Sequence, residues 1–172
     1  EAATGRDVVD RMGLSGVAEG WRVAEAIADA DVPVLAGPVL AVPTRDSDRY
    51  DKPYRNAALL QDAGVQVALR TGDAENVRNL PFHAGFAAAY GMTRENALRA
   101  VTIEPARIFG VADRLGSIEV GKQANVFVTD GDPFETKTTV HHLFIQGYRI
   151  PIESRHTKLY DEFLNRTPGV SE

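Results

Sequence analysis

The sequence has no cysteine, and among its 172 residues there are only four histidines and one tryptophan. Without cysteine it can form no disulfide, thiolate nucleophile or cysteine-ligated zinc site. No apolar run approaches the roughly 20 residues that a membrane-spanning helix needs. The net charge of −5 argues against a nucleic-acid surface, which usually carries a basic stripe. We therefore expect neither a membrane nor a nucleic acid as a partner.

The length is sufficient for one compact core but too small for a complete (β/α)₈ barrel, which takes roughly 250 residues. The composition, 44% hydrophobic and 25% charged, excludes disordered and collagen-like classes. Residue 1 is Glu rather than Met, which predicts a processed product or a fragment. The sequence leaves the compartment open between the cytoplasm and export after removal of a signal peptide.

In the first two-thirds of the chain, short apolar runs alternate with amphipathic segments. The pattern predicts strands at residues 8–15, 32–35 and 65–69. It predicts helices at residues 20–30, 55–63, 81–90, 94–101 and 105–109. No two-residue hairpin joins the strands, so helical crossovers are expected to link parallel strands.

The last third follows a different pattern, in which short apolar runs are separated by tight turns. It predicts a small antiparallel sheet with strands at residues 116–120, 125–129, 140–145 and 148–152. Residues 157–166 form an amphipathic helix pattern, with Leu159 and Phe163 paired at i,i+4.

The densest polar cluster is the loop of residues 70–79, which directly follows a predicted buried strand. Ligands of α/β proteins bind beyond the carboxyl ends of strands. Asp73 and Glu75 could ligate a metal or act as a base, and Arg70 and Arg78 could clamp an anionic substrate. The structural alternative is that Asp73 caps a turn and Arg78 forms an ion pair.

The four histidines lack the spacing of a zinc-binding pair. His83, early in the helix after this loop, could face the same site and bind substrate, or could simply be a helix-end histidine. His141 and His142 are adjacent in a predicted strand, so one is expected to pack and the other to be solvated. His156 is expected at the surface. The long loop of residues 37–54 could act as a lid or simply be solvated.

A distinctive series of motifs fills residues 79–133, and the spacing and turn residues agree over about fifty residues. It resembles the C-terminal region of metal-dependent amidohydrolases, particularly the imidazolonepropionase-like branch. The matching positions are Ala97-Leu98, Thr102, Pro105-Ala106, Gly110, Gly116-Ser117, Gly121-Lys122, Ala124 and Asp132-Pro133.

The resemblance implies an α/β fold consisting of the last strands and helices of a (β/α)₈ barrel, part of a small antiparallel β-sandwich and a C-terminal helix. We expect the barrel part at residues 1–115, the sandwich strands at 116–152 and the tail helix at 153–172. The family's metal ligands include a His-x-His motif, which is absent here, and an aspartate after the eighth strand.

Asp73 is the only metal ligand of the family that the resemblance assigns to this sequence. The resemblance also implies a divalent metal in the complete enzyme, with zinc as the leading candidate. The family aspartate more usually follows Thr directly, whereas Gly72 intervenes here, and Leu14-Ser15-Gly16 offers no sixth-strand histidine. We expect little or no metal binding by this chain alone.

The resemblance thus predicts the C-terminal portion of a hydrolase that cleaves non-peptide C–N bonds of a small amide or cyclic amide. This chain is expected to be inactive alone. The alternative is a non-catalytic binding or scaffold protein that has lost metal ligands. Bare sheet edges predict either self-association or pairing with a missing N-terminal half.

Overall fold

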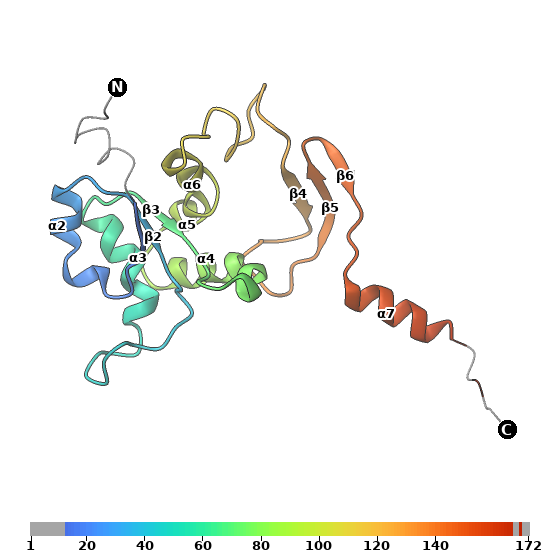
Figure 1. Ribbon diagram of the computed structural model, residues 1–172, viewed down its shortest axis with the longest axis horizontal. Helices are drawn as coiled ribbons and strands as arrows, with labels where there is room; N and C mark the ends of the chain where they lie inside the picture. The colour runs from blue at the N-terminus through green and yellow to red at the C-terminus, as the bar shows by residue number, and fades with distance from the viewer. Residues whose placement is uncertain (1–12, 167–168, 170–172) are drawn as a thin grey trace, which may run out of the picture.

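The computed structural model describes residues 13–166 and 169 (Figure 1). Of the strand expected at residues 8–15, the part before residue 13 lies outside this range. The elements are, in order, β1 (Leu14–Gly16), η1 (Gly20–Arg22), α2 (Ala24–Asp29), β2 (Val34–Ala36), α3 (Lys52–Asp62), β3 (Val67–Leu69), η2 (Ala74–Asn79), α4 (Leu80–Ala89), α5 (Arg94–Ala100), α6 (Ile103–Ile108), β4 (Val126–Thr129), β5 (Val140–Ile145), β6 (Tyr148–Ile150) and α7 (Arg155–Leu164).

The first sheet is parallel, in the order β1-β2-β3, as the alternation of strands and helices predicts. Its register places Ser15, Leu35 and Ala68 side by side, and Gly16, Ala36 and Leu69 one residue further. Because side chains alternate along a strand, these two rows point to opposite faces of the sheet.

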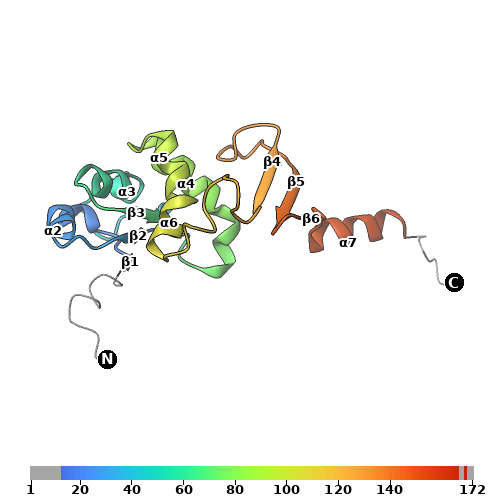
Figure 2. The same ribbon diagram turned by 90° about the horizontal axis from the view of Figure 1, so that it is seen from above.

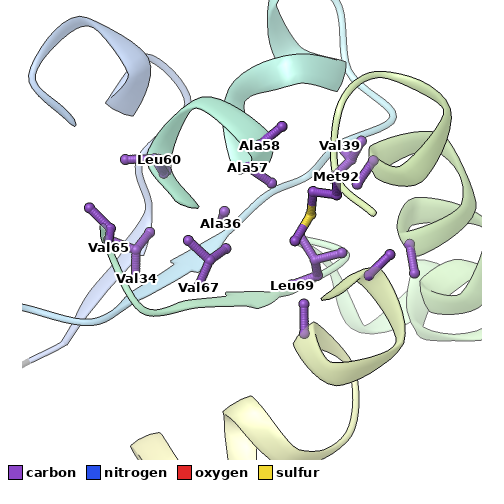
Figure 3. Close-up of a cluster of buried hydrophobic side chains, with 14 of the residues drawn as sticks. Val34, Ala36, Val39, Ala57, Ala58, Leu60, Val65, Val67, Leu69 and Met92 are labelled. Carbon is purple, nitrogen blue, oxygen red and sulfur yellow. The ribbon is translucent and has the colours of Figure 1, made fainter. Parts of the chain in front are cut away.

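One face of this sheet carries the hydrophobic core (Figure 3). Val34 and Val67 of the strands and Leu60 of α3 are 0–2% exposed. The remaining core positions on α3, α4 and α5 are mostly alanines, which let helices approach the sheet closely; they are Ala57, Ala58, Ala84, Ala87, Ala97 and Ala100. Thr93 caps α5 by accepting a hydrogen bond from the Asn96 N–H.

The second sheet is antiparallel, in the order β4-β5-β6, with an irregularity of register between Val128 and Thr129. It lies beside α4, and α7 extends away from the body of the molecule (Figures 1 and 2). A capping box between Ser154 and Thr157 starts α7, but no residue of this helix is buried.

One predicted strand is wrong: residues 116–120 form bends and a turn. Ile118 and Val120 there are fully or almost fully exposed, and this segment pairs with no strand of the part described by the structure. An apolar run becomes a strand only where another backbone is available to pair with it. No helix among the described residues is long and apolar enough to span a membrane.

Candidate functional site

The carboxyl ends of β1, β2 and β3 meet at one edge of the parallel sheet. The Gly37 N–H donates to the Gly16 carbonyl over 3.2 Å, and the Arg70 N–H donates to the Ala36 carbonyl over 2.9 Å. These bonds continue the ladder one residue beyond the strands. The polar loop after β3 is therefore fixed beside the segments that leave β1 and β2.

Arg70 spans this edge with its side chain. Its Nη1 donates to Ser15 Oγ over 2.7 Å, and its Nη2 donates to the Gly72 carbonyl over 2.6 Å. Ser15 lies in the sheet row that points away from the core. The guanidinium therefore links β1 to the loop after β3 and fixes a positive charge at the strand ends.

Gly37 allows the close approach of β2 and β3 at this edge. Its φ is +141°, and a Cβ placed on it would lie 2.1 Å from the Arg70 carbonyl oxygen. Pro38 in turn packs within 3.6 Å of the position of a Cβ on Gly72. The Gly37–Pro38 segment is thus held against the turn that precedes Asp73.

Asp73 is exposed and stands at the N-cap position of η2. Its backbone is extended, and its side chain makes no capping bond. Its carbonyl oxygen accepts a hydrogen bond from Thr71 Oγ1 over 3.3 Å. Asp73 thus follows the end of β3 by four residues, and its carboxylate does not act as the structural cap that the alternative interpretation required.

Arg78 lies in the last turn of η2 and is exposed. It forms no ion pair within residues 13–166, so the structural alternative for this residue is not observed either. The loop after β3 thus brings Arg70 and Asp73 to one edge and carries Arg78 five residues further along. Substrate binding by Arg70 and Arg78 stays a prediction.

His83 is buried within α4, where it is 3% exposed. Its Nδ1 accepts a hydrogen bond from the Val39 N–H over 3.0 Å, and burial lowers the pKa of the ring. The neutral tautomer with the proton on Nε2 satisfies this contact. His83 therefore anchors the segment after β2 to α4, and its expected contact with substrate stays a prediction.

The other histidines lie far from this edge, on the second sheet and α7. His141 faces Asp130 at 3.4 Å, and His142 lies 3.2 Å from an Arg149 nitrogen. Both rings are exposed, so the expectation that one of them packs is wrong. No residue of β5 is buried, so side chains on both faces of this strand can remain in solvent. His156 is exposed, as expected.

The structure contains a charged cluster around η1 that was not predicted from the sequence. Arg22 Nη2 lies 2.5 and 2.7 Å from the two carboxylate oxygens of Asp48, and Arg22 Nε donates to Glu19 over 2.9 Å. The hydrogen bonds with Asp48 first, and then with Glu19, raise the pKa of Arg22. Arg45 reaches the same Glu19. The only sequence signal was the alternation of charge in the long loop.

Next to this cluster, Asp51 is 5% exposed, and its Oδ1 has no hydrogen-bond partner. Its other oxygen accepts from Arg49 over 3.1 Å. Buried Asn56 orders the neighbouring turn, because it accepts from the Trp21 N–H and donates to the Val17 carbonyl. Periodicity identifies Asn56 only as a helical position and gives no sign of this role.

The described residues do not fit a metal ion by themselves. No group of three or more histidine, aspartate or glutamate side chains in residues 13–166 is arranged to hold one. Asp73 offers a single carboxylate, and the His83 Nδ1 is engaged by Val39. A metal site needs three or four protein ligands in most cases, so a metal at this edge would need ligands from outside residues 13–166.

Comparison with known proteins finds relatives by sequence and by structure. The chain is 38% identical over 85 residues to an imidazolonepropionase of Shouchella clausii, a match that covers 47% of this chain and 19% of that protein. A crystal structure of an amidohydrolase from Thermotoga maritima superposes with a TM-score of 0.68 at 31% identity, over 79% of this chain and 36% of that one.

A zinc-bound adenosine deaminase from Xanthomonas campestris shares the fold, with a TM-score of 0.52 at 21% identity over 83% of this chain and 38% of that one. The chain thus spans less than two-fifths of each of these proteins. The amidohydrolase family model matches residues 35–150, which include β3 and its polar loop, all of α3 to α6 and the second sheet. The chain belongs to the amidohydrolase family.

Proposed function

We propose that this chain is the C-terminal portion of a hydrolase that acts on the non-peptide C–N bond of a small amide or cyclic amide. One observation carries the proposal: the parallel strand ends bring an anchored arginine, Arg70, and an exposed carboxylate, Asp73, to the same edge. Family membership supports the reaction class. The barrel, sandwich and tail division at residues 1–115, 116–152 and 153–172 is part of the same proposal.

The two side chains suit different tasks in amide hydrolysis. Arg70 is pre-oriented by Ser15 and Gly72, so it could stabilise negative charge on the substrate without a large loss of side-chain entropy. Asp73 makes no side-chain cap and could accept a proton from attacking water. Because the metal does not fit the described residues alone, its ligands would come from the remainder of a family-length protein.

The test uses the complete protein that carries this sequence, assayed against a panel of small amides and cyclic amides. Asp73→Asn should lower kcat/KM by about 100-fold or more if the carboxylate takes part in proton transfer. Asp29→Asn, which makes the same change at an exposed aspartate at the end of α2, is the matched control and should retain activity. Unchanged turnover in Asp73→Asn would exclude this role, whereas the 172-residue chain alone should show no turnover.

The second candidate is a binding or scaffold protein of the same family. It is favoured by Gly72, which has a φ of +98° and separates Thr71 from Asp73, where the resemblance leads us to expect an aspartate directly after the threonine. If this candidate is correct, the complete protein binds members of the panel without hydrolysing them. Asp73→Asn then leaves that binding unchanged.

A further inference from the structure

A cavity of about 130 Å³ lies between the start of η1, the end of β2 and the first turns of α3. All of its lining residues belong to one continuous stretch, residues 18–57. No part of its wall therefore depends on the second sheet or on α7. The stretch is also held from within, because Asn56 of α3 binds the backbone at Val17 and Trp21.

Most of the wall is apolar, with Ala36, Val39, Ala41 and Ala57 among the lining residues. For comparison, a cavity of roughly 150 Å³ can hold benzene, which has six heavy atoms. The space is therefore suited to a small organic molecule with a short apolar tail. A single water would leave most of the wall without contact.

Not every charged side chain in the cavity wall has a partner of opposite charge among the described residues. The carboxylate of Asp48 is bound by Arg22, and that of Glu19 by Arg22 and Arg45. Each acid on the wall is thus already neutralised by a guanidinium. A cationic ligand would have to compete with these short ion pairs.

Lys52 is different from these groups. Its Nζ lies 4.2 Å from the centre of the Trp21 ring, and it forms no ion pair or hydrogen bond with any residue from 13 to 166. The ring face holds the ammonium by a cation–π contact and leaves its protons for another acceptor. Lys52 is also the first residue of α3, where the helix dipole favours an anion.

We propose that this cavity is a binding site for a small organic carboxylate of about six heavy atoms, with its carboxylate on Lys52 and its apolar tail against Val39, Ala41 and Ala57. The cavity shares Gly37 and Pro38 with the strand-end edge, where they contact Arg70 and the turn at Gly72. The site goes beyond the proposed hydrolase function and does not depend on it, since neither Asp73 nor a metal takes part.

Trp21 provides the measurement, because it is the only tryptophan of the 172-residue chain and lines the cavity. Tryptophan fluorescence is titrated with n-butyrate, n-butanol and n-butylamine at constant ionic strength. We expect a saturable change with n-butyrate in the millimolar range, and an affinity for the alcohol and the amine at least tenfold weaker. A saturable response that is equal for all three, or strongest for the amine, overturns the proposal.

Variants separate the charge from the volume. Lys52→Met keeps a long stem beside Trp21 and should weaken n-butyrate binding about tenfold, the loss expected for one charge-assisted hydrogen bond. Lys137→Met is the matched control, because Lys137 is exposed and lies outside the cavity. Ala41→Phe should fill the space and abolish binding. Thermal melts verify that each variant is folded, and n-butyrate binding unchanged in Lys52→Met refutes the assignment.

Discussion

The two sheets of this molecule differ in burial, although both regions carry large apolar side chains. In the parallel-sheet region, residues 14–110, β2 and β3 lie against α2 to α5 and hold a continuous core. In the antiparallel region, residues 126–164, no residue of β4, β5, β6 or α7 is buried. Large side chains are present there too: Phe127, Tyr148 and Phe163 are 51%, 74% and 63% exposed.

This difference shows that segments with a hydrophobic pattern form helices and strands in both regions. Burying the apolar side chains also requires another part of the structure to pack against them. Exposed apolar area on this scale usually marks a surface that contacts other polypeptide. The expectation that the chain pairs with a missing N-terminal half, or with itself, was based on the bare edges of the parallel sheet; the exposure of this second region does not test it, and it remains a proposal. Variants placed in matched pairs, one in each region, test whether the burial contrast is also a contrast in stability.

The largest contrast should come from truncating a large apolar side chain in each region. Leu60→Ala removes a side chain that is 0% exposed and should lower the free energy of unfolding by about 2–5 kcal/mol. Phe163→Ala on α7 should change it by less than about 0.5 kcal/mol. Urea unfolding of the 172-residue chain measures both. Comparable losses would show that α7 packs against the body, contrary to the structure.

The next contrast concerns glycines with positive φ. Gly37→Ala would place a Cβ against the Arg70 carbonyl oxygen, and we expect a loss of about 2–3 kcal/mol. Gly147→Ala, in the β5–β6 turn, meets nothing within 4 Å and should cost only about 1 kcal/mol for its φ of +82°. Equal losses in thermal or urea unfolding would mean that the β2–β3 edge relaxes around the methyl group.

Helix caps give a smaller and more local comparison. Thr93→Ala removes the cap of α5, whose Ala97 and Ala100 are buried, and should lower global stability by about 1 kcal/mol. Ser154→Ala removes the capping box of α7, which buries nothing. It should speed amide hydrogen exchange within α7 and leave the global unfolding midpoint unchanged. A shift of that midpoint by Ser154→Ala would contradict the contrast.

The smallest effect on stability is expected from lowering the pH. Burial alone would raise the pKa of Glu104, but hydrogen bonds from Gln66 and Arg99 and the charges of Arg107 and Arg99 together outweigh it, so the pKa is lowered. The folded state therefore binds this proton less readily than the unfolded state. The stabilisation is complete above the ordinary pKa of 4.5 and is lost as the pH falls through the lowered value.

The matched acid in the second region is Asp130, whose pKa is lowered chiefly by the Thr139 N–H. Glu104→Gln should flatten the dependence of the unfolding midpoint on pH between about 3 and 5. Asp130→Asn should leave that dependence unchanged, because Asp130 is exposed and its partners, the Thr139 N–H and the His141 ring, belong to the same exposed β4–β5 region. The reverse result would show that the second sheet contributes to global stability.

Much of the fold could be predicted from local sequence. The strand at residues 140–145 and the helix at 94–101 follow from their apolar spacing and from turn or capping residues, and the structure has β5 and α5 there. The strand at residues 116–120 failed because periodicity does not reveal whether a pairing partner exists. The candidate site was predictable only in its position, since polar residues after a buried parallel strand lie at a strand-end edge.

The contacts of individual side chains could not be predicted from the sequence. The bonds from Arg70 to Ser15 and from Val39 to His83 join residues that are 55 and 44 positions apart. The Lys52–Trp21 contact depends in the same way on two separate elements meeting. No spacing rule reaches over such distances, because these contacts exist only after the strands and helices have packed.

By itself, the sequence determined the alternation of strands and helices, the change to an antiparallel sheet and the family to which the chain belongs. These properties depend on local spacing, turn chemistry and short motifs, which are written along the chain. Only the tertiary structure decided that His83 anchors a loop, that Asp73 is exposed and that Lys52 faces a cavity. These properties depend on which surfaces exclude water from one another, and that is set by packing between distant segments.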